Sequence, residues 1–364
     1  MLPQAIAALR QDLSLHLNLS KSRVETMALI VIGMISARTV NLSHLASERP
    51  AGALIASTYR RLQRFFQHAR LAQDWSAPLV ARLLDLTGSW HLVLDRTQWQ
   101  VGARDVNVLV LAAVTPHFRV PLIWTVIGGR GCSDTDQRIT LMRRYLKLFH
   151  AATIRLLLAD REFVGTEWIE FLHESGIPFA IRLRGDLRVT TEAGRDLMLE
   201  AHLGGRGRTR FLHGRLGAGR MDGPLLNFAL KRLGSGELLA VVSNRPGPAA
   251  LAAYRKRWAI ECLFGDAKTR GLNIEDTRLT DPRKLDLLMG LTALAIAWAA
   301  RSAIALIWPR APRRGSHGHL TKSWFRTGFD HLRRLLRTDP VKAVQEWRKL
   351  RANPPQSEAE SRVV

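Results

Sequence analysis

Between residues 90 and 183 the chain passes in a set order through runs typical of strands and runs typical of helices. Three apolar, β-branched runs come first, and residues that favour turns (Gly, Asp, Asn and Pro) separate them. Two helical patterns then alternate with two more apolar runs. The expected strands are 91–95, 106–114, 119–127, 153–159 and 178–183, and the expected helices are 134–149 and 165–175.

This order, β-β-β-α-β-α-β, predicts an α/β fold built on a mixed sheet. Short turns join the first three strands, so these run antiparallel, whereas strands joined through a helix run parallel. A mixed sheet with this order of elements is ribonuclease H-like. We therefore expect a ribonuclease H-like core with a β-rich insertion, a helical N-terminal domain and a helical C-terminal segment.

The pattern outside the core indicates where the chain divides into domains. Residues 1–88 show helical periodicity without a convincing strand. Short alternating runs in the Gly- and Arg-rich stretch 185–247 predict a small β-subdomain, after which a long helix is expected to begin near Ala249. The predicted domains are 1–88, 89–308 interrupted by the insertion 185–247, and the basic helical segment 309–364.

The charge balance of the chain indicates a polyanionic partner. Lys and Arg number 54 against 31 Asp and Glu, so the formal net charge is +23. Hydrophobic residues make up 46% of the chain, which is a globular value and excludes a disordered basic tail. A folded protein this positive attracts nucleic acid or an anionic membrane surface.

Several features favour nucleic acid and a cytoplasmic location over a membrane. The apolar run 287–300 is shorter than the roughly 20 residues of a spanning helix, and Arg301 would lie inside the span, so we predict a buried helix. Cys132 and Cys262 are the only cysteines, which is too few for a disulfide scaffold and indicates a reducing compartment. No secretory signal is recognisable at the N-terminus.

A basic helix is predicted in the N-terminal domain, from Thr58 to Arg70. It carries Arg60, Arg61 and Arg64 beside apolar residues, and it contains no acidic residue. One interpretation is an ordinary solvated surface helix. The other is a helix that faces phosphate groups of a nucleic acid.

Two carboxylates follow buried strands of the predicted sheet. Asp95 follows Leu92-Val-Leu, and Asp160 follows Leu156-Leu-Leu-Ala. Carboxylates at such positions can converge and hold divalent cations, and two such cations about 3.5–4 Å apart can clamp the attacking and leaving oxygens of a phosphodiester. Each residue also has a structural interpretation, because Asp160 could cap the following helix and Asp95 could be a turn residue.

A third carboxylate, Glu261, lies in a helical pattern with three other polar residues. Tyr254, Arg257, Glu261 and Lys268 are separated by 3, 4 and 7 positions. At about 100° per residue their side chains fall within roughly 60° of one another on a helix. A metal ligand flanked by phosphate-binding groups accounts for this face. A solvated face with an incidental Glu–Arg pair is the alternative, because such pairs are common.

Tyr254-x-x-Arg257-Trp258-x-x-Glu261 with Lys268 resembles the Tyr-Arg-Glu-Lys (YREK) signature of bacterial insertion-sequence transposases of the DDE type. Further segments agree with this family and follow in the same order over about residues 40–337. They are Ser57-Thr-Tyr-Arg-Arg-Leu-Gln-Arg-Phe-Phe66, Asp95-Arg-Thr-Gln-Trp99, Gly131-Cys-Ser-Asp-Thr-Asp136, Asp160-Arg-Glu-Phe163, Gly271-Leu-Asn-Ile-Glu-Asp-Thr-Arg278 and Lys322-Ser-Trp-Phe-Arg326.

The resemblance implies a role for each of these residues. Asp95, Asp160 and Glu261 would form the catalytic triad and bind two Mg²⁺ ions, for which Mn²⁺ can substitute. Tyr254, Arg257 and Lys268 would hold phosphates of the transposon end. The N-terminal domain would bind the DNA end, and the C-terminal segment would serve dimerisation. Candidate DNA contacts are Arg60, Arg61, Arg64 and Trp258.

The implied activity is cleavage at the ends of an insertion sequence and joining of the 3′-OH ends to target DNA, in a cut-and-paste pathway. The implied partners are double-stranded DNA, in the form of terminal inverted repeats and target, and a second copy of the chain in the synaptic complex. Two alternatives remain open from the sequence. One is a metal-dependent nuclease without strand transfer, and the other is an inactive DNA-binding relic.

Overall fold

The computed structural model describes most of the chain, and the core and the residues of the predicted site are all included. The described residues are 2–49, 52–129, 131–203, 208–308, 310, 312–313, 316 and 320–348. The predicted C-terminal segment 309–364 is therefore described only in part, and its last sixteen residues lie outside the described ranges.

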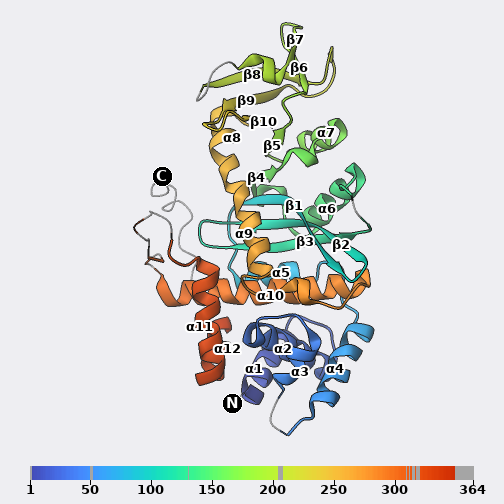
Figure 1. Cartoon of the computed structure of the whole chain (residues 1–364), viewed down its shortest axis with the longest axis vertical. Coiled ribbons are helices and arrows are strands. Elements are labelled where there is room, and N and C mark those ends of the chain that lie inside the picture. Colours follow the sequence, from blue (N-terminus) through green and yellow to red (C-terminus); the bar gives the residue numbers. More distant parts are fainter. Residues whose placement is uncertain are drawn as a thin grey trace.

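One mixed sheet of ten strands runs through the molecule in the order β3-β2-β1-β4-β5-β10-β9-β8-β6-β7 (Figure 1). Its first half is the predicted core, and its second half comes from the insertion. The strands are β1 (Trp90–Val101), β2 (Arg104–Val114), β3 (Arg119–Ile127), β4 (Ile154–Ala159), β5 (Phe179–Leu183), β6 (Arg188–Thr191), β7 (Asp196–Met198), β8 (Thr209–Leu216), β9 (Leu226–Arg232) and β10 (Leu238–Ser243).

The core half has the predicted ribonuclease H-like arrangement. Strands β1, β2 and β3 form an antiparallel meander. Strand β4 then pairs parallel to β1, and β5 pairs parallel to β4. The two crossovers run through α6 (Thr135–Leu148) and α7 (Thr166–Glu174). The mixed α/β fold class predicted from the order of elements is confirmed.

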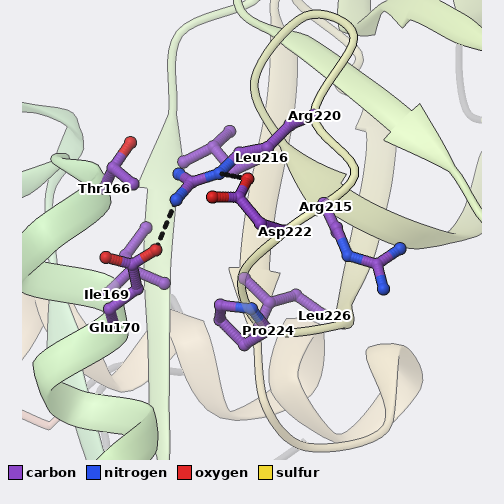
Figure 2. A pocket seen from close by; sticks show the side chains of 9 residues that line it. All are labelled: Thr166, Ile169, Glu170, Arg215, Leu216, Arg220, Asp222, Pro224 and Leu226. Atoms are coloured by element: carbon purple, nitrogen blue, oxygen red, sulfur yellow. Dashed lines mark hydrogen bonds and ion pairs between the residues drawn. The ribbon is translucent and has the colours of Figure 1, made fainter.

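The stretch 185–247, predicted as a β-rich insertion, contains strands β6 to β10. Strand β10 pairs antiparallel with β5 along Ala240–Ser243, so the insertion strands continue the core sheet. The reason is that β5 would otherwise be an unpaired edge, and the apolar run of β10 satisfies its backbone groups. Arg220 also ties the insertion to helix α7, because its Nη2 donates to Glu170 Oε1 at 2.5 Å (Figure 2). Its Nε donates to Asp222 Oδ1 within the insertion at 3.0 Å.

Helices from both ends of the chain pack against α10 (Pro282–Ile307) and against each other. The N-terminal helices include the predicted basic helix, now α4, and the C-terminal pair follows α10. They are α1 (Leu2–Ser14), α2 (Lys21–Ala37), α3 (Leu42–Ser47), α4 (Ile55–His68), α5 (Ser76–Leu83), α11 (Trp324–Thr338) and α12 (Pro340–Arg348). In Figure 1, α10 crosses the molecule between the sheet and the N-terminal helices.

Helix α10 is the buried helix that the apolar run predicted. It is 26 residues long and apolar enough to cross a membrane, but 83% of its most apolar window is buried inside the protein. Its neighbours approach so closely that only glycine fits at two contacts. A Cβ at Gly290 would lie 2.6 Å from Cζ2 of Trp75, and one at Gly328 on α11 would lie 1.8 Å from the carbonyl oxygen of Ala299.

A buried ion pair joins the N-terminal helices to the core. Arg144 on α6 donates from Nε to Asp74 Oδ2 at 2.9 Å, and its Nη2 also bonds Asp74 Oδ1. The same guanidinium donates to Thr125 Oγ1 at 2.8 Å and to the carbonyl oxygen of Trp124 at 2.9 Å. Asp74, which lies just before α5, therefore neutralises a cation that is enclosed between α6 and β3.

We expect Asp74→Ala to lower the free energy of unfolding by about 3–5 kcal/mol, because it leaves the Arg144 charge buried without its counter-ion. Urea unfolding followed by circular dichroism measures the change. Asp186→Ala is the matched control, because Asp186 pairs with Arg184 at a site where both side chains are 62% exposed. Its effect should stay within about 0.5 kcal/mol. Equal losses in the two variants would contradict the role of the buried pair.

Candidate active site

The parallel pairing of β1 with β4 places the first two carboxylates side by side. Leu94 of β1 lies opposite Ala159 of β4, and Asp95 and Asp160 are the next residues on each strand. Asp95 does not end its strand as predicted, because β1 continues to Val101. Asp160 caps the short helix η2 (Arg161–Phe163), with its Oδ1 accepting from the Arg161 amide at 2.8 Å. Asp160 therefore caps a short helix that the sequence did not predict, whereas the predicted helix, α7, begins after Gly165.

The third carboxylate reaches the same place from a helix. The long helix predicted from Ala249 is divided into α8 (Gly247–Tyr254), a 3₁₀ turn η4 (Arg255–Arg257) and α9 (Trp258–Ala267). Glu261 lies in the first turn of α9. Figure 1 shows α9 running across the sheet next to β1 and β4.

One guanidinium lies between all three carboxylates. Arg257 Nη1 is 3.2 Å from Asp95 Oδ2 and 3.9 Å from Asp160 Oδ2, and Nη2 is 2.6 Å from Glu261 Oε1. The Arg257 side chain is only 13% exposed. The hydroxyl of Tyr254 donates to Asp160 Oδ1 at 3.4 Å. The cluster thus consists of three acids, one permanent cation and one phenol.

Burial shapes the electrostatics of the cluster. Burial raises the pKa of Asp95 to about 6, against the lowering effect of the Arg96 amide and of Arg257. Burial, with the nearby charge of Asp160, also raises the pKa of the Tyr254 phenol well above its usual value. The phenol therefore stays protonated at neutral pH, and it acts as a hydrogen-bond donor.

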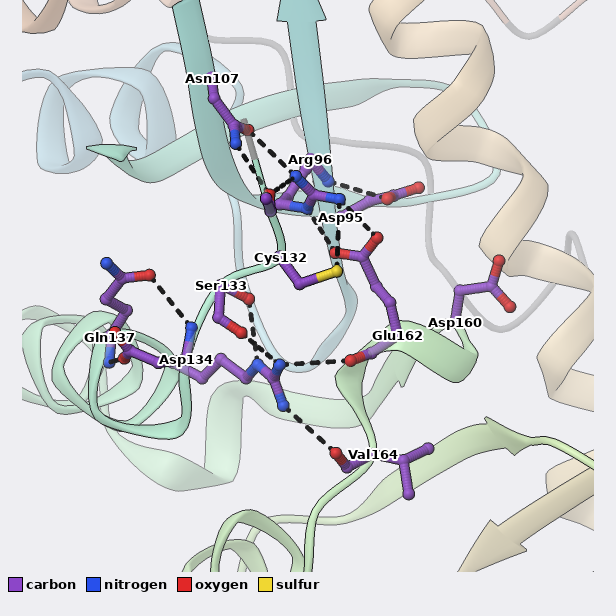
Figure 3. Close-up of polar contacts among 12 residues, drawn as sticks. Asp95, Arg96, Asn107, Cys132, Ser133, Asp134, Gln137, Asp160, Glu162 and Val164 are labelled. Atoms are coloured by element: carbon purple, nitrogen blue, oxygen red, sulfur yellow. Dashed lines mark hydrogen bonds and ion pairs between the residues drawn. The ribbon is translucent and has the colours of Figure 1, made fainter. Parts of the chain in front are cut away.

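A second ion pair connects β1 to the short helix η2 that follows β4 (Figure 3). Arg96 donates from Nε and Nη2 to the two oxygens of Glu162, at 2.5 and 2.9 Å. Its Nη1 also reaches Asn107 Oδ1 at 3.4 Å. Sequence reasoning missed Arg96 and Glu162. Their signal was position, because Arg96 follows Asp95 directly and Glu162 lies two residues after Asp160.

Lys268 does not join the face that helical spacing assigned to it. Its Nζ is 2.9 Å from the carbonyl oxygen of Gln98 on β1 and 2.8 Å from Glu275 Oε1. Helix α9 ends at Ala267, and Lys268 leaves the helical conformation with ψ −137°. Spacing on an ideal helix therefore no longer describes where its side chain lies. Trp258, by contrast, is 62% exposed at the start of α9.

The three arginines predicted as DNA contacts on α4 separate into two groups. Arg60 and Arg64 are exposed. Arg61 is directed inward, because its Nε donates to Thr26 Oγ1 at 2.7 Å and its Nη2 lies 3.3 Å from Glu25 Oε1. Arg61 therefore links α4 to α2, and the expectation that it contacts DNA loses its support.

A groove of about 820 Å³ lies between the segment after β4 and the insertion. Arg161, Arg184 and Arg188 line it together with Glu162, Asp186 and the backbone at Gly217. Arg184 lies 3.4 Å from Asp186 and Arg188 lies 2.9 Å from Asp196, so two of these arginines are already paired with acids. The sequence did not single out these arginines, because they belong to different elements.

The donor set of the cluster fits a hard divalent cation. Carboxylate oxygens are the ligands that Mg²⁺ and Mn²⁺ prefer. One oxygen from each of the three acids faces the same point, and the Arg257 guanidinium lies there. Within the described ranges, no three His, Cys, Asp or Glu side chains are arranged to hold a metal ion as they stand. The guanidinium would have to move for the carboxylates to close on a metal.

The sequence matches the family described as "Transposase DDE domain" over residues 86–298, which is more than half of the chain. The chain belongs to this family. The protein is therefore a DNA-binding enzyme of the DDE superfamily of transposases. The matched region contains the whole carboxylate cluster. The predicted membership of the DDE transposases of insertion sequences is confirmed by this match.

Two other comparisons add little to this assignment. No curated protein matches the transposase. Among solved structures, endonuclease V from Bacillus subtilis is similar over 62% of this chain and 89% of its own, with 13% sequence identity and a TM-score of 0.24.

We expect Arg96→Ala to slow DNA cleavage by about tenfold, because it removes the pair with Glu162 that holds the two aspartate-bearing segments together. It should also lower the free energy of unfolding by about 2 kcal/mol. Partial recovery of the cleavage rate in Arg96→Lys would identify a positioning role. Arg348→Ala is the control, since its pair with Asp12 at 2.9 Å joins α12 to α1. If Arg348→Ala slowed cleavage as much as Arg96→Ala does, the effect of Arg96 would not be local to the carboxylates.

Proposed function

We propose that this protein is a DNA transposase that binds the ends of an insertion sequence, cleaves them and joins the 3′-OH ends to target DNA in a cut-and-paste pathway. The observation that carries the proposal is the meeting of Asp95, Asp160 and Glu261 at one guanidinium inside the matched family domain. Three carboxylates in a basic protein are suited to phosphodiester chemistry with divalent cations.

Asp95, Asp160 and Glu261 are proposed to hold two Mg²⁺ ions, which Mn²⁺ can replace. Bound there, the ions supply activation of the attacking oxygen and stabilisation of charge on the phosphate. The pair between Arg96 and Glu162 keeps the two aspartates in register. No covalent bond to a protein nucleophile is required, because water and then the released 3′-OH attack phosphorus.

The phosphate-binding residues of the proposed signature have unequal support. Tyr254 and Arg257 present a protonated hydroxyl and a guanidinium at the carboxylates, where the DNA phosphate next to the cut would lie. Lys268 is occupied by Gln98 and Glu275, so its contact with phosphate requires release of the Glu275 pair. The Tyr-Arg-Glu part of the signature is therefore better supported than the lysine.

The exposed arginines of α4 are proposed to contact DNA outside the carboxylate cluster. Arg64 lines a cavity of about 400 Å³ together with His68, Arg278 and Lys284, which come from α4 and from the stretch leading into α10. Four basic side chains around one cavity favour the DNA backbone as ligand. Residues 1–88 are accordingly proposed as the DNA-end-binding domain, and the helices after 309 as part of a homodimer contact in the synaptic complex.

The decisive experiment is a cleavage and strand-transfer assay with Mg²⁺ on DNA that carries the sequences flanking the gene. We expect Asp95→Asn, Asp160→Asn and Glu261→Gln each to reduce cleavage by at least about 10³-fold, while a gel-shift assay shows DNA binding within a few-fold of the wild type. Any one of these variants retaining wild-type cleavage would remove its residue from the triad.

The products of the wild-type enzyme distinguish the proposal from its alternatives. Joined DNA products support a transposase. Cleavage without joining under the same conditions would indicate a nuclease, and a shifted band without products would indicate an inactive DNA-binding protein.

We expect the double variant Arg60→Ala with Arg64→Ala to weaken DNA binding similarly for all sequences. The slope of log K against log salt should fall by about 2, because each phosphate contact contributes about 0.9. Fluorescence anisotropy at several salt concentrations measures the slope. Arg61→Ala is the matched control from the same helix, and its inward bonds predict a loss of stability with an unchanged slope. An unchanged slope in the double variant would show that Arg60 and Arg64 do not contact DNA phosphates.

A further inference from the structure

The position of Arg257 has a consequence for metal binding. Its guanidinium contacts Oδ2 of Asp95 and Oε1 of Glu261 and lies 3.9 Å from Oδ2 of Asp160, so it occupies the point on which the three carboxylates converge. An arginine keeps its charge throughout the accessible pH range. The DNA-free protein therefore carries its own cation at the carboxylates.

A guanidinium and a divalent cation cannot occupy these oxygens together. Mg²⁺ requires oxygen ligands at about 2.0–2.1 Å in a compact octahedral shell. One oxygen of Asp95 and one oxygen of Glu261 already accept hydrogen bonds from Arg257. Two cations at the same oxygens would also repel each other. Binding of metal therefore requires Arg257 to leave.

Arg257 has an alternative partner when DNA is present. It lies in the 3₁₀ turn η4, next to the exposed Trp258, at the face where Tyr254 also points its hydroxyl. A phosphate at this face can accept two hydrogen bonds from the guanidinium, which now donates one to Asp95 and one to Glu261. If the Arg257 guanidinium moves from the carboxylates to a phosphate, it exchanges one anionic partner for another and is not left unpaired.

We propose that Arg257 is an internal counter-cation that holds the three carboxylates until DNA arrives, and that its transfer to a DNA phosphate couples DNA binding to divalent-cation binding. The inference rests on the proposed function, because it takes the carboxylates as metal ligands and DNA as the incoming anion. It adds an order to the events. Without DNA the site disfavours metal, and with DNA the carboxylates are released.

The first test measures Mn²⁺ binding to the full-length protein without DNA, by electron paramagnetic resonance. We expect Arg257→Gln to bind Mn²⁺ at least tenfold more tightly than the wild type, because the competing cation is gone. Arg255→Gln is the matched control, since it removes the same charge from an exposed position in the same turn. Its affinity should lie within twofold of the wild type. Unchanged or weaker Mn²⁺ binding by Arg257→Gln would overturn the proposal.

Thermal unfolding supplies a second readout on the same variants. In EDTA, Arg257→Gln should melt at a lower temperature than the wild type, because three carboxylates then repel one another without compensation. Mn²⁺ should raise its melting temperature by more than it raises that of the wild type. Arg257→Lys, which retains a positive charge, should keep the low Mn²⁺ affinity. Tight Mn²⁺ binding by Arg257→Lys would contradict the role of the charge.

The coupling itself is tested on the wild type, so the result does not depend on whether a variant folds. A duplex with the sequence that flanks the gene should tighten Mn²⁺ binding by at least fivefold in the wild type and by less than twofold in Arg257→Gln. Equal Mn²⁺ affinity of the wild type with and without this duplex would overturn the coupling.

Glu261→Gln separates a failure of this inference from a failure of the proposed function. If Glu261→Gln loses Mn²⁺ binding in the presence of the duplex while Arg257→Gln without the duplex behaves as the wild type, only the counter-cation is wrong. If Glu261→Gln binds Mn²⁺ in the presence of the duplex as the wild type does, the carboxylates are not the metal ligands, and both proposals fall.

Discussion

Like charges brought together in a partly buried site must be compensated, and the architecture around the carboxylates of this transposase follows from that requirement. Parallel pairing of β1 with β4 sets Asp95 beside Asp160, and α9 adds Glu261. Burial raises the pKa of Asp95 to about 6, and the charge of Arg257 opposes this rise. Arg257 lies within 4 Å of all three acids and offsets the repulsion among them.

The scaffold restricts how far these acids can move. Strands β1 and β4 lie in the middle of a ten-stranded sheet, with paired neighbours on both sides. The bidentate pair of Arg96 with Glu162 connects the segments that carry the two aspartates. Below the sheet, α10 gives the N-terminal and C-terminal helices one common buried support. A central strand thus holds Asp95, and Asp160 directly follows its parallel neighbour, whereas Glu261 and the Arg257 guanidinium lie on a helix and the turn before it.

The order of elements and the positions of the carboxylates could be predicted because both depend on local patterns. Alternating and helical spacing of apolar residues marks strands and helices, and Asp95 and Asp160 were recognisable because each follows an apolar run. Long-range pairing could not be predicted in the same way. The junction of β10 with β5 joins residues about 60 positions apart in sequence, and the Arg144–Asp74 pair joins residues 70 apart. Neither leaves a periodic signal.

By itself the sequence determined the type of sheet, the basic character of the protein and which carboxylates follow apolar runs, because residue chemistry and periodicity are local properties. Tertiary structure decided which charges meet. It placed Arg257 among the acids and turned Arg61 inward to α2. It also moved Lys268 to Gln98 and Glu275, because a helix that ends one residue earlier no longer orients the side chain beyond it. Ion pairs form across space, and a charge becomes a ligand, a counter-ion or a surface contact only when folding sets its neighbours.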